Sequence, residues 1–103
     1  MKFDEDQFNV LRKINKKADL TQRELSKNLN LSLGKINYCL NALKRKGLIK
    51  IKNFKNNKHK YTYLYYLTPK GISKKTRYTI DFMKIKMKEY DDLKKEMEKD
   101  KNF

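Results

Sequence analysis

The sequence is poor in the residues that break helices or cross-link a chain. Its 103 residues include one proline, three glycines, one cysteine and no tryptophan. The lone cysteine, Cys39, excludes an internal disulfide and fits a reducing compartment. The sequence also lacks a signal-peptide pattern and any apolar run near the roughly 18 residues of a membrane helix. These absences predict a small cytoplasmic protein that does not enter a membrane.

Residues that carry out enzymatic chemistry are scarce as well. His59 is the single histidine, paired carboxylates occur only in the C-terminal tail, and the three glycines are isolated. Isolated glycines exclude a glycine-rich phosphate loop, and we find no combination of nucleophile, base and acid. The sequence therefore predicts a protein that is not an enzyme, with no catalytic residue, no metal ligand set and no cofactor.

Acidic residues are almost absent from the middle of the chain. The formal net charge is +15, and residues 20–68 contain eleven basic residues against one acidic residue, Glu24. The flanking segments are nearer balance, with net charges of +1 over residues 1–19 and +4 over residues 69–103. Concentrated positive charge of this kind predicts a polyanion as the partner.

Four segments share a pattern that starts helices. In each, an apolar residue comes directly before a capping residue, and a second apolar residue comes four positions after it. The side chain of the capping residue can accept hydrogen bonds from free backbone N–H groups at the start of a helix. The pattern occurs at Asp4, Thr21, Ser32 and Thr68, and Pro69 suits a first helical position. Apolar residues at helical spacing then predict helices over residues 5–17, 22–29, 33–46 and 69–99.

Two strand-like runs lie between the third and fourth predicted helices. Residues 48–55 alternate apolar and basic side chains, residues 61–68 are aromatic and β-branched, and the stretch NNKHK between them has no apolar residue. Gly47 stands where a left-handed residue ends the preceding helix. The predicted fold class is therefore mainly α with one small antiparallel β-hairpin.

The last predicted helix is too long for the small domain before it. Without an internal breaker it would extend on the order of 40 Å, so we divide the chain into a domain over residues 1–68 and a long helix over residues 69–103. A second stripe on this helix holds Phe82, Ile85 and Leu93. The main stripe, interrupted at Lys94, predicts homodimerisation through Ile80, Met83, Met87, Tyr90 and Met97.

The second and third predicted helices form a helix-turn-helix, whose second helix would enter the major groove of DNA. Its apolar stripe, directed inward, is Leu33, Ile36, Cys39, Leu40 and Leu43. Asparagine can bond an adenine edge, lysine can reach guanine or phosphate, and a capping serine can bond phosphate. The predicted DNA-binding residues of this helix are Ser32, Leu33, Gly34, Lys35, Asn37, Tyr38, Asn41 and Arg45. The basic hairpin tip adds contacts to the backbone or minor groove from Lys55, Lys58, His59 and Lys60.

The stretch from Leu20 to Phe54, followed by YLYYLTPKGI, resembles the winged helix-turn-helix of MarR-type bacterial transcription regulators. It is most similar to their short subgroup associated with exopolysaccharide operons. The matching residues are Leu25, Leu29, Leu31, Ser32, Ile36, Leu40, Leu43, Gly47, Leu48, Ile49 and the run from Leu67 to Gly71. The resemblance implies a dimeric regulator, most simply a repressor, that binds an inverted repeat in double-stranded DNA.

Two other functions fit parts of the sequence. A winged helix can dock on a partner protein, with the lysine content arising from coding bias. A strand carrying Tyr61, Tyr63, Tyr65 and Tyr66 can stack the bases of RNA or of a single strand. Single residues also have alternative roles: Tyr38 can pack on a neighbouring helix, Cys39 can fill the core or sense oxidants, and His59 can bind metal.

Overall fold

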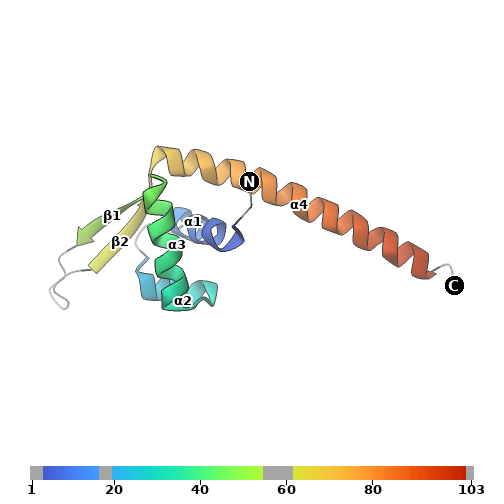
Figure 1. The fold of residues 1–103 in the computed structure, drawn as a ribbon, viewed down its shortest axis with the longest axis horizontal. Coiled ribbons are helices and arrows are strands. Elements are labelled where there is room, and N and C mark those ends of the chain that lie inside the picture. Colours follow the sequence, from blue (N-terminus) through green and yellow to red (C-terminus); the bar gives the residue numbers. More distant parts are fainter. Residues whose placement is uncertain (1–3, 17–19, 55–61, 102–103) are drawn as a thin grey trace.

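The part of the chain that the structure describes forms four helices and one two-stranded antiparallel sheet (Figure 1). The computed structural model describes residues 4–16, 20–54 and 62–101. In chain order the elements are α1 (Glu5–Lys16), α2 (Gln22–Leu29), α3 (Leu33–Arg45), β1 (Ile49–Phe54), β2 (Thr62–Leu67) and α4 (Pro69–Lys101). The predicted fold class is confirmed.

The predicted capping residues make the backbone hydrogen bonds that start the helices. The Thr21 hydroxyl accepts a hydrogen bond from the Glu24 N–H at 3.2 Å, and the Glu24 carboxylate accepts one from the Thr21 N–H at 3.2 Å. The Ser32 hydroxyl accepts from the Lys35 N–H at 3.1 Å, which satisfies one free donor of α3. Local sequence therefore fixes where α2 and α3 begin.

The corner between α2 and α3 is held by short-range hydrogen bonds. Asn30 adopts a left-handed conformation with φ of 53°, which ends α2. The Leu31 N–H then donates to the Ser26 carbonyl at 3.2 Å, and the Ser26 hydroxyl donates to the Leu31 carbonyl. The Gln22 side-chain amide donates to the Leu33 carbonyl at 3.1 Å, which ties the start of α2 to the start of α3. These bonds set the direction in which α3 leaves the turn.

One hydrophobic core joins α1, α2, α3 and the base of the hairpin. Buried side chains from every one of these elements contribute to it. Within the described residues, every buried side-chain nitrogen and oxygen atom has a hydrogen-bond partner. Full burial of a valine, leucine or isoleucine side chain contributes about 1.5–3 kcal/mol to the free energy of folding. The core consists of Val10, Leu11, Ile14, Leu20, Leu25, Ile36, Cys39, Leu40, Leu43, Leu48, Ile49 and Tyr65.

Leu33 and Ile51 are exposed apolar side chains, and Leu33 was predicted both for the inward stripe of its helix and as a DNA-binding residue. Leu33, the first residue of α3, is 46% exposed. Ile51 is 36% exposed although its neighbour Ile49 on the same strand face is buried. The strand pair extends beyond the core, so alternation along β1 predicts the face of a side chain but not how far the core reaches.

The hairpin is a regular antiparallel ladder at its base. Ile49 pairs with Leu67, and the register continues to the pair of Phe54 with Thr62. The predicted tip residues, with the tyrosine at position 61, lie outside the described residues. Figure 1 shows the two strands projecting from the helical core.

A cluster of backbone contacts joins the hairpin to α4. The Thr68 hydroxyl donates to the Gly47 carbonyl at 2.7 Å and accepts from the Gly71 N–H at 3.0 Å. Gly47 has φ of 73°, the left-handed conformation expected after α3. Gly71 lies directly against the Leu48 carbonyl, and a Cβ atom at Gly71 would stand 1.9 Å from that oxygen. Glycine at this position lets α4 turn back across the end of α3.

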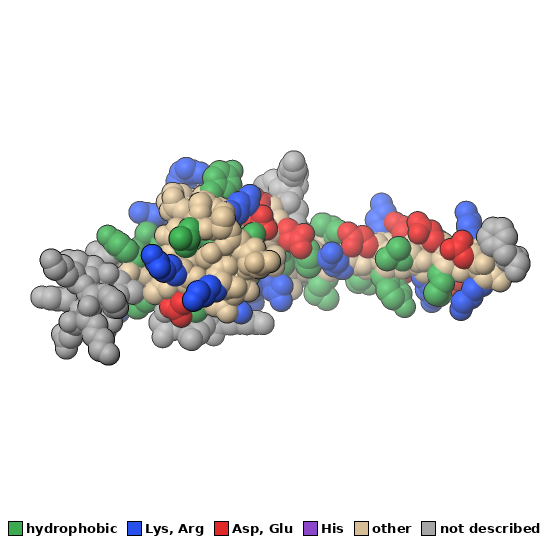
Figure 2. Space-filling model, turned by 90° about the horizontal axis from the view of Figure 1, so that it is seen from below, with side chains coloured by type: hydrophobic (Ala, Val, Ile, Leu, Met, Phe, Trp, Pro, Cys, Tyr) green, Lys and Arg blue, Asp and Glu red, His purple; other side chains and the backbone are tan. Residues whose placement is uncertain are grey.

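Helix α4 runs well past the domain on which it starts. Its 33 residues correspond to about 50 Å, and the molecule measures 67 × 26 × 20 Å. The Phe82 ring packs on the Phe8 ring of α1 with centroids 5.4 Å apart, and the following residues project away (Figures 1 and 2). None of the helices in the three described stretches has the length and hydrophobicity of a membrane span.

We expect Gly71→Ala to lower the free energy of unfolding by about 1–3 kcal/mol, because the new methyl group collides with the Leu48 backbone. Gly34→Ala is the matched control. Its Cβ would meet nothing closer than the Ser32 hydroxyl at 4.0 Å, so helix propensity should make it stabilising by about 0.5–1 kcal/mol. Urea denaturation of both variants tests this, and equal effects would contradict the close contact.

Candidate nucleic-acid interface

Helix α3 has one buried side and one exposed side. Ile36, Cys39, Leu40 and Leu43 are buried among α1, α2 and the hairpin. Tyr38, between them in sequence, is 56% exposed, so it does not pack into a neighbouring helix within this chain. The predicted DNA-binding residues that are exposed are Ser32, Leu33, Gly34, Asn37, Tyr38, Asn41 and Arg45. Of these, Gly34, Asn37, Tyr38, Asn41 and Arg45 lie on the side of α3 opposite its buried residues, at about 100° per residue.

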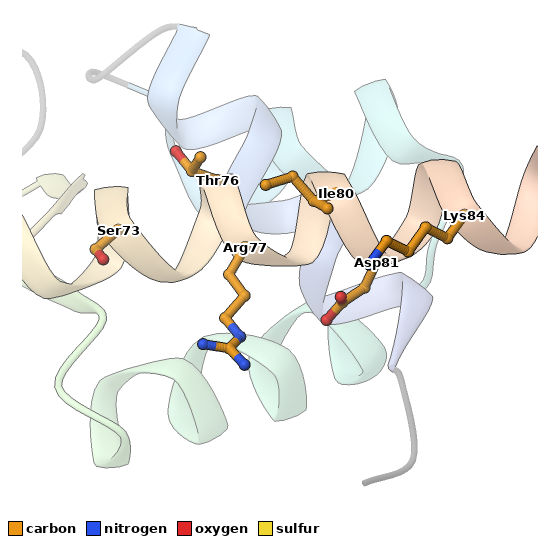
Figure 3. A pocket seen from close by; sticks show the side chains of 6 residues that line it. All are labelled: Ser73, Thr76, Arg77, Ile80, Asp81 and Lys84. Atoms are coloured by element: carbon orange, nitrogen blue, oxygen red, sulfur yellow. The ribbon is translucent and has the colours of Figure 1, made fainter.

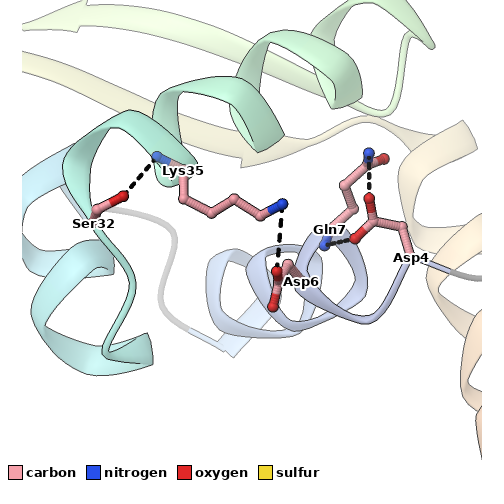
Figure 4. Close-up of polar contacts among 5 residues, drawn as sticks. All are labelled: Asp4, Asp6, Gln7, Ser32 and Lys35. Carbon is pink, nitrogen blue, oxygen red and sulfur yellow. Dashed lines mark hydrogen bonds and ion pairs between the residues drawn. The ribbon is translucent and has the colours of Figure 1, made fainter.

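Lys35 differs from the other predicted contacts because it is half-buried and turned toward α1 (Figure 4). Its ammonium nitrogen lies 3.6 Å from Oδ2 of Asp6 and 5.2 Å from the centroid of the Tyr38 ring. Both charged side chains keep about two fifths of their surface exposed, so water weakens this ion pair. The pair holds the lysine beside the exposed face rather than pointing outward from it.

Helix α1 also holds the far end of α3 through a buried glutamine. The Gln7 side chain donates to Oδ2 of Asp4 at 3.0 Å, and the Gln7 N–H donates to Oδ1 of Asp4 at 3.1 Å (Figure 4). The ammonium of Lys46, the residue that caps the C-terminus of α3, donates to the side-chain oxygen Oε1 of Gln7 at 2.9 Å. Polar contacts from α1 therefore reach both the start and the end of α3. No local sequence pattern predicts these contacts, because they join residues 29 and 39 positions apart.

Positive charge is also exposed on the hairpin, beyond the end of α3. Lys50 and Lys52 are exposed on β1, and the sequence analysis assigned them no contact. Their alternation with Ile49 and Ile51 is the signal that places them on the outer face of the strand. The four residues predicted at the tip, Lys55, Lys58, His59 and Lys60, lie outside the described residues.

The tyrosines of β2 are divided between different environments. Tyr65 is buried in the core, and its burial, with Tyr63 beside it, raises the pKa of its hydroxyl. Tyr63 is 56% exposed on the same strand face, whereas Tyr66 is exposed on the opposite face. The described part of the strand therefore presents separated rings, which is a poor surface for stacking successive bases.

Cys39 is fully buried on the inner side of α3. Burial, and then the negative charge of Asp4, raise the pKa of its thiol from 9.0 to about 11. A buried neutral thiol is a small apolar side chain with little reactivity, which favours the core-filling role over oxidant sensing. Among the residues that the structure describes, no three histidine, cysteine or carboxylate side chains could hold a metal ion together.

Comparison with known proteins identifies the domain. A family model described as winged helix-turn-helix DNA-binding matches residues 4–50. A search of curated proteins finds no match. The PcaV transcriptional regulator from Streptomyces coelicolor, solved with its natural ligand, has a TM-score of 0.71 at 20% identity, covering 82% of this chain and 58% of that chain.

Two further solved structures are more similar in sequence. FabT from Streptococcus pneumoniae, solved in complex with DNA, has a TM-score of 0.63 at 27% identity, covering 87% of this chain and 61% of that chain. Wild-type MarR from E. coli has a TM-score of 0.63 at 30% identity, covering 74% of this chain and 55% of that chain. This chain thus spans 55–61% of the length of the three regulators. The predicted winged helix-turn-helix fold is confirmed, and the exopolysaccharide subgroup stays a prediction.

The Cys39 thiol should make stability depend on pH in alkaline solution. Because its pKa is raised from 9.0 to about 11, its contribution to the free energy of unfolding is complete below pH 9 and is lost as the pH rises toward 11. The expected slope is at most about 1.4 kcal/mol per pH unit. Urea denaturation between pH 8 and 10 measures this slope. The Cys39→Ala variant is the control, because it lacks the thiol but keeps the tyrosines and lysines that also titrate in this range. Identical slopes in the two proteins would contradict the raised pKa.

Proposed function

Because this chain is a winged helix-turn-helix protein with the fold of the MarR-type regulators, we propose that it regulates transcription by binding double-stranded DNA as a homodimer. The observation that carries the proposal is the exposed side of α3. It combines two asparagines, a tyrosine and an arginine with a helix start whose N–H groups point outward. Repression in the cytoplasm is the simplest output of such a protein, since a dimer bound at a promoter blocks polymerase without any further activity.

Each exposed group of α3 has a chemical role in this proposal. Asn37 and Asn41 read base edges in the major groove, where an amide bonds both N6 and N7 of adenine. Ser32 and the N-terminus of α3 hold a phosphate, aided by the positive end of the helix dipole. Gly34, which has no side chain, lets the first turn lie close to the duplex. Arg45, three helical turns after Gly34, reaches the DNA phosphate backbone.

The hairpin supplies contacts that are independent of sequence. We assign Lys55, Lys58, His59 and Lys60 to the phosphate backbone or minor groove next to the α3 site. Exposed Lys50 and Lys52 support this assignment, because they place positive charge on the strand that precedes these residues in the chain. A lysine ammonium carries charge without a fixed hydrogen-bonding geometry. These residues therefore add affinity for DNA but discriminate little among DNA sequences.

The domain over residues 1–68 then binds DNA while the helix over residues 69–103 pairs two copies. The exposed side chains Ile80, Met83, Met87, Tyr90 and Met97 support dimerisation, because a soluble helix with such a stripe gains by burying it. Two-fold symmetry places two α3 helices in successive major grooves, with half-site centres about 34 Å apart or a multiple of that.

We expect Asn41→Ala and Lys58→Ala to weaken DNA binding in different ways. Asn41→Ala should lose about 1–3 kcal/mol on a selected genomic fragment and little on random duplex. Lys58→Ala should weaken both equally and make the slope of log affinity against log salt about 0.9 shallower. Fluorescence anisotropy titrations over a salt series measure both effects. Equal losses on both duplexes for Asn41→Ala would remove this residue from base readout.

Asp6→Asn should increase the affinity for random duplex, because it releases the Lys35 ammonium from its ion pair. The freed lysine adds about one phosphate contact, so the salt slope should steepen by about 0.9. Glu5→Gln is the matched control, since Glu5 is an exposed acid on the same helix. It changes the net charge equally without touching Lys35. If both variants gain the same affinity, Asp6 acts through net charge alone and the ion pair has no part in binding.

A further inference from the structure

Five of the exposed apolar side chains of α4 follow one repeat of three- and four-residue intervals: Ile80, Met83, Met87, Tyr90 and Met97. Each of these five is between 48% and 66% exposed. Ile72, Ile85 and Leu93 are exposed outside this repeat. Figure 2 shows hydrophobic groups along the projecting part of the helix. Lys94 occupies the one position of the repeat that is not apolar. We call this set of six positions the α4 stripe: Ile80, Met83, Met87, Tyr90, Lys94 and Met97.

The α4 stripe lies on the side of the helix turned away from the domain. The domain covers Gly71, Lys75, Tyr78 and Phe82, which recur at helical spacing along one side of α4. At about 100° per residue, the α4 stripe is centred about 120° around the helix from this covered side. A second copy can therefore approach the stripe without displacing the domain.

The α4 stripe reads the same in both directions along the helix, because its intervals are three, four, three, four and three residues. Two antiparallel copies can therefore place Ile80 opposite Met97 and Met87 opposite Tyr90. Lys94 then lies over Met83, where its stem packs and its ammonium reaches water. Parallel copies would instead bring Lys94 against Lys94, which is unfavourable in a seam.

Charge along α4 also distinguishes the two arrangements. The helix carries seven basic residues and one acidic residue from Lys70 to Lys88, but four basic and six acidic residues from Glu89 to Lys101. An antiparallel pair places each acidic half beside the basic half of the other copy. Beside the seam, Lys84 then faces Asp91 of the second copy, and Arg77 faces Glu98 of the second copy.

A parallel pair has one favourable flanking contact, between Lys86 and Asp91, and this lysine is already engaged. The Lys86 ammonium lies 3.3 Å from Oε2 of Glu89 in its own chain. It also lies 5.1 Å from the centroid of the Phe82 ring, on the domain side of the helix. The parallel arrangement would have to break these contacts.

A shallow hollow on α4 lies where the antiparallel arrangement needs space (Figure 3). It has a volume of about 340 Å³, and its lining is Ser73, Thr76, Arg77, Ile80, Asp81 and Lys84. The small side chains Ser73 and Thr76 extend the line of the stripe toward the start of the helix. Met97 of a second copy would lie on Ile80 at this hollow, with its neighbouring Glu98 beside Arg77.

We propose that two copies of this chain pair through an antiparallel α4 seam centred between Lys88 and Glu89, with Lys84–Asp91 and Arg77–Glu98 ion pairs flanking it. The proposal rests on the homodimer of the proposed function and adds its orientation and register. The seam uses the stripe and the hollow together, and it leaves Ile85 and Leu93 on the other side of the helix.

A distance measurement on the full chain without DNA tests the orientation. A nitroxide label at Lys101→Cys should give a distance of about 40 Å between copies, because 25 helical residues separate the two labels along the seam. A parallel seam would bring the same labels within about 20 Å of each other. The buried native Cys39 should not react with the label. A distance near 20 Å would overturn the antiparallel seam.

A charge exchange tests the register. Lys84→Glu should weaken the dimer at least tenfold at low salt, since it places an acid beside Asp91 of the second copy twice in each dimer. Lys84→Glu combined with Asp91→Lys should restore dimerisation to within about threefold. Lys99→Glu is the matched control, because it makes the same charge change on the side turned away from the stripe. Sedimentation equilibrium measures all four proteins, and a double variant as weak as the single one would overturn this register.

The outcomes separate this proposal from the function on which it rests. A short label distance in a dimer that binds duplex DNA would overturn the antiparallel seam and leave the regulator intact. A chain that stays monomeric up to millimolar concentration would overturn the seam and the homodimer. Loss of DNA binding by α3 variants is measured on a different surface, so it does not bear on the seam.

Discussion

Burial of one side of α3 decides where the residues of its other side point. The buried side of α3 consists of Ile36, Cys39, Leu40 and Leu43. Exposing one of these side chains to water would cost on the order of 1.5–3 kcal/mol of folding free energy. Asn37, Tyr38 and Asn41 are therefore held outward by packing on the opposite side of the helix. Helix α1 adds a polar contact at each end of α3, through Asp6 at its start and Gln7 at its end.

Much of this arrangement follows from local patterns. Thr21 with Glu24, Ser32 and Thr68 are capping residues whose hydrogen bonds involve neighbours three positions away, so sequence alone places the helix starts. The left-handed Gly47 follows in the same way from the end of an apolar stripe. The exposed side of α3 is likewise predictable, because fixing the inner side of a helix also fixes its outer side.

The features that sequence did not predict depend on contacts between distant segments. The Lys35–Asp6 pair and the approach of Gly71 to Leu48 require knowing how α1 and α4 cross α3. Leu33 was placed on the inward stripe from periodicity but is exposed, and Ile51 is exposed although Ile49 on the same strand face is buried. Periodicity gives the direction of a side chain, while the extent of the core is a property of the whole domain.

Helix α4 has two sides with separate tasks. One side binds the domain through Gly71, Tyr78 and Phe82, and the other carries the α4 stripe, whose intervals and charges are complementary to those of a second copy. If two copies pair as proposed, the same helix connects each domain to the seam. The spacing of two α3 helices on DNA would then be set by the register of the seam.

The most direct measurement is an NMR titration of the isotopically labelled chain with double-stranded DNA. If the outer side of α3 binds the duplex, the largest amide shift changes should occur from Ser32 to Arg45, with smaller changes in β1. The buried and seam residues should change little. Changes confined to β2 or α4, with α3 unaffected at saturating duplex, would contradict the claim that this surface binds DNA.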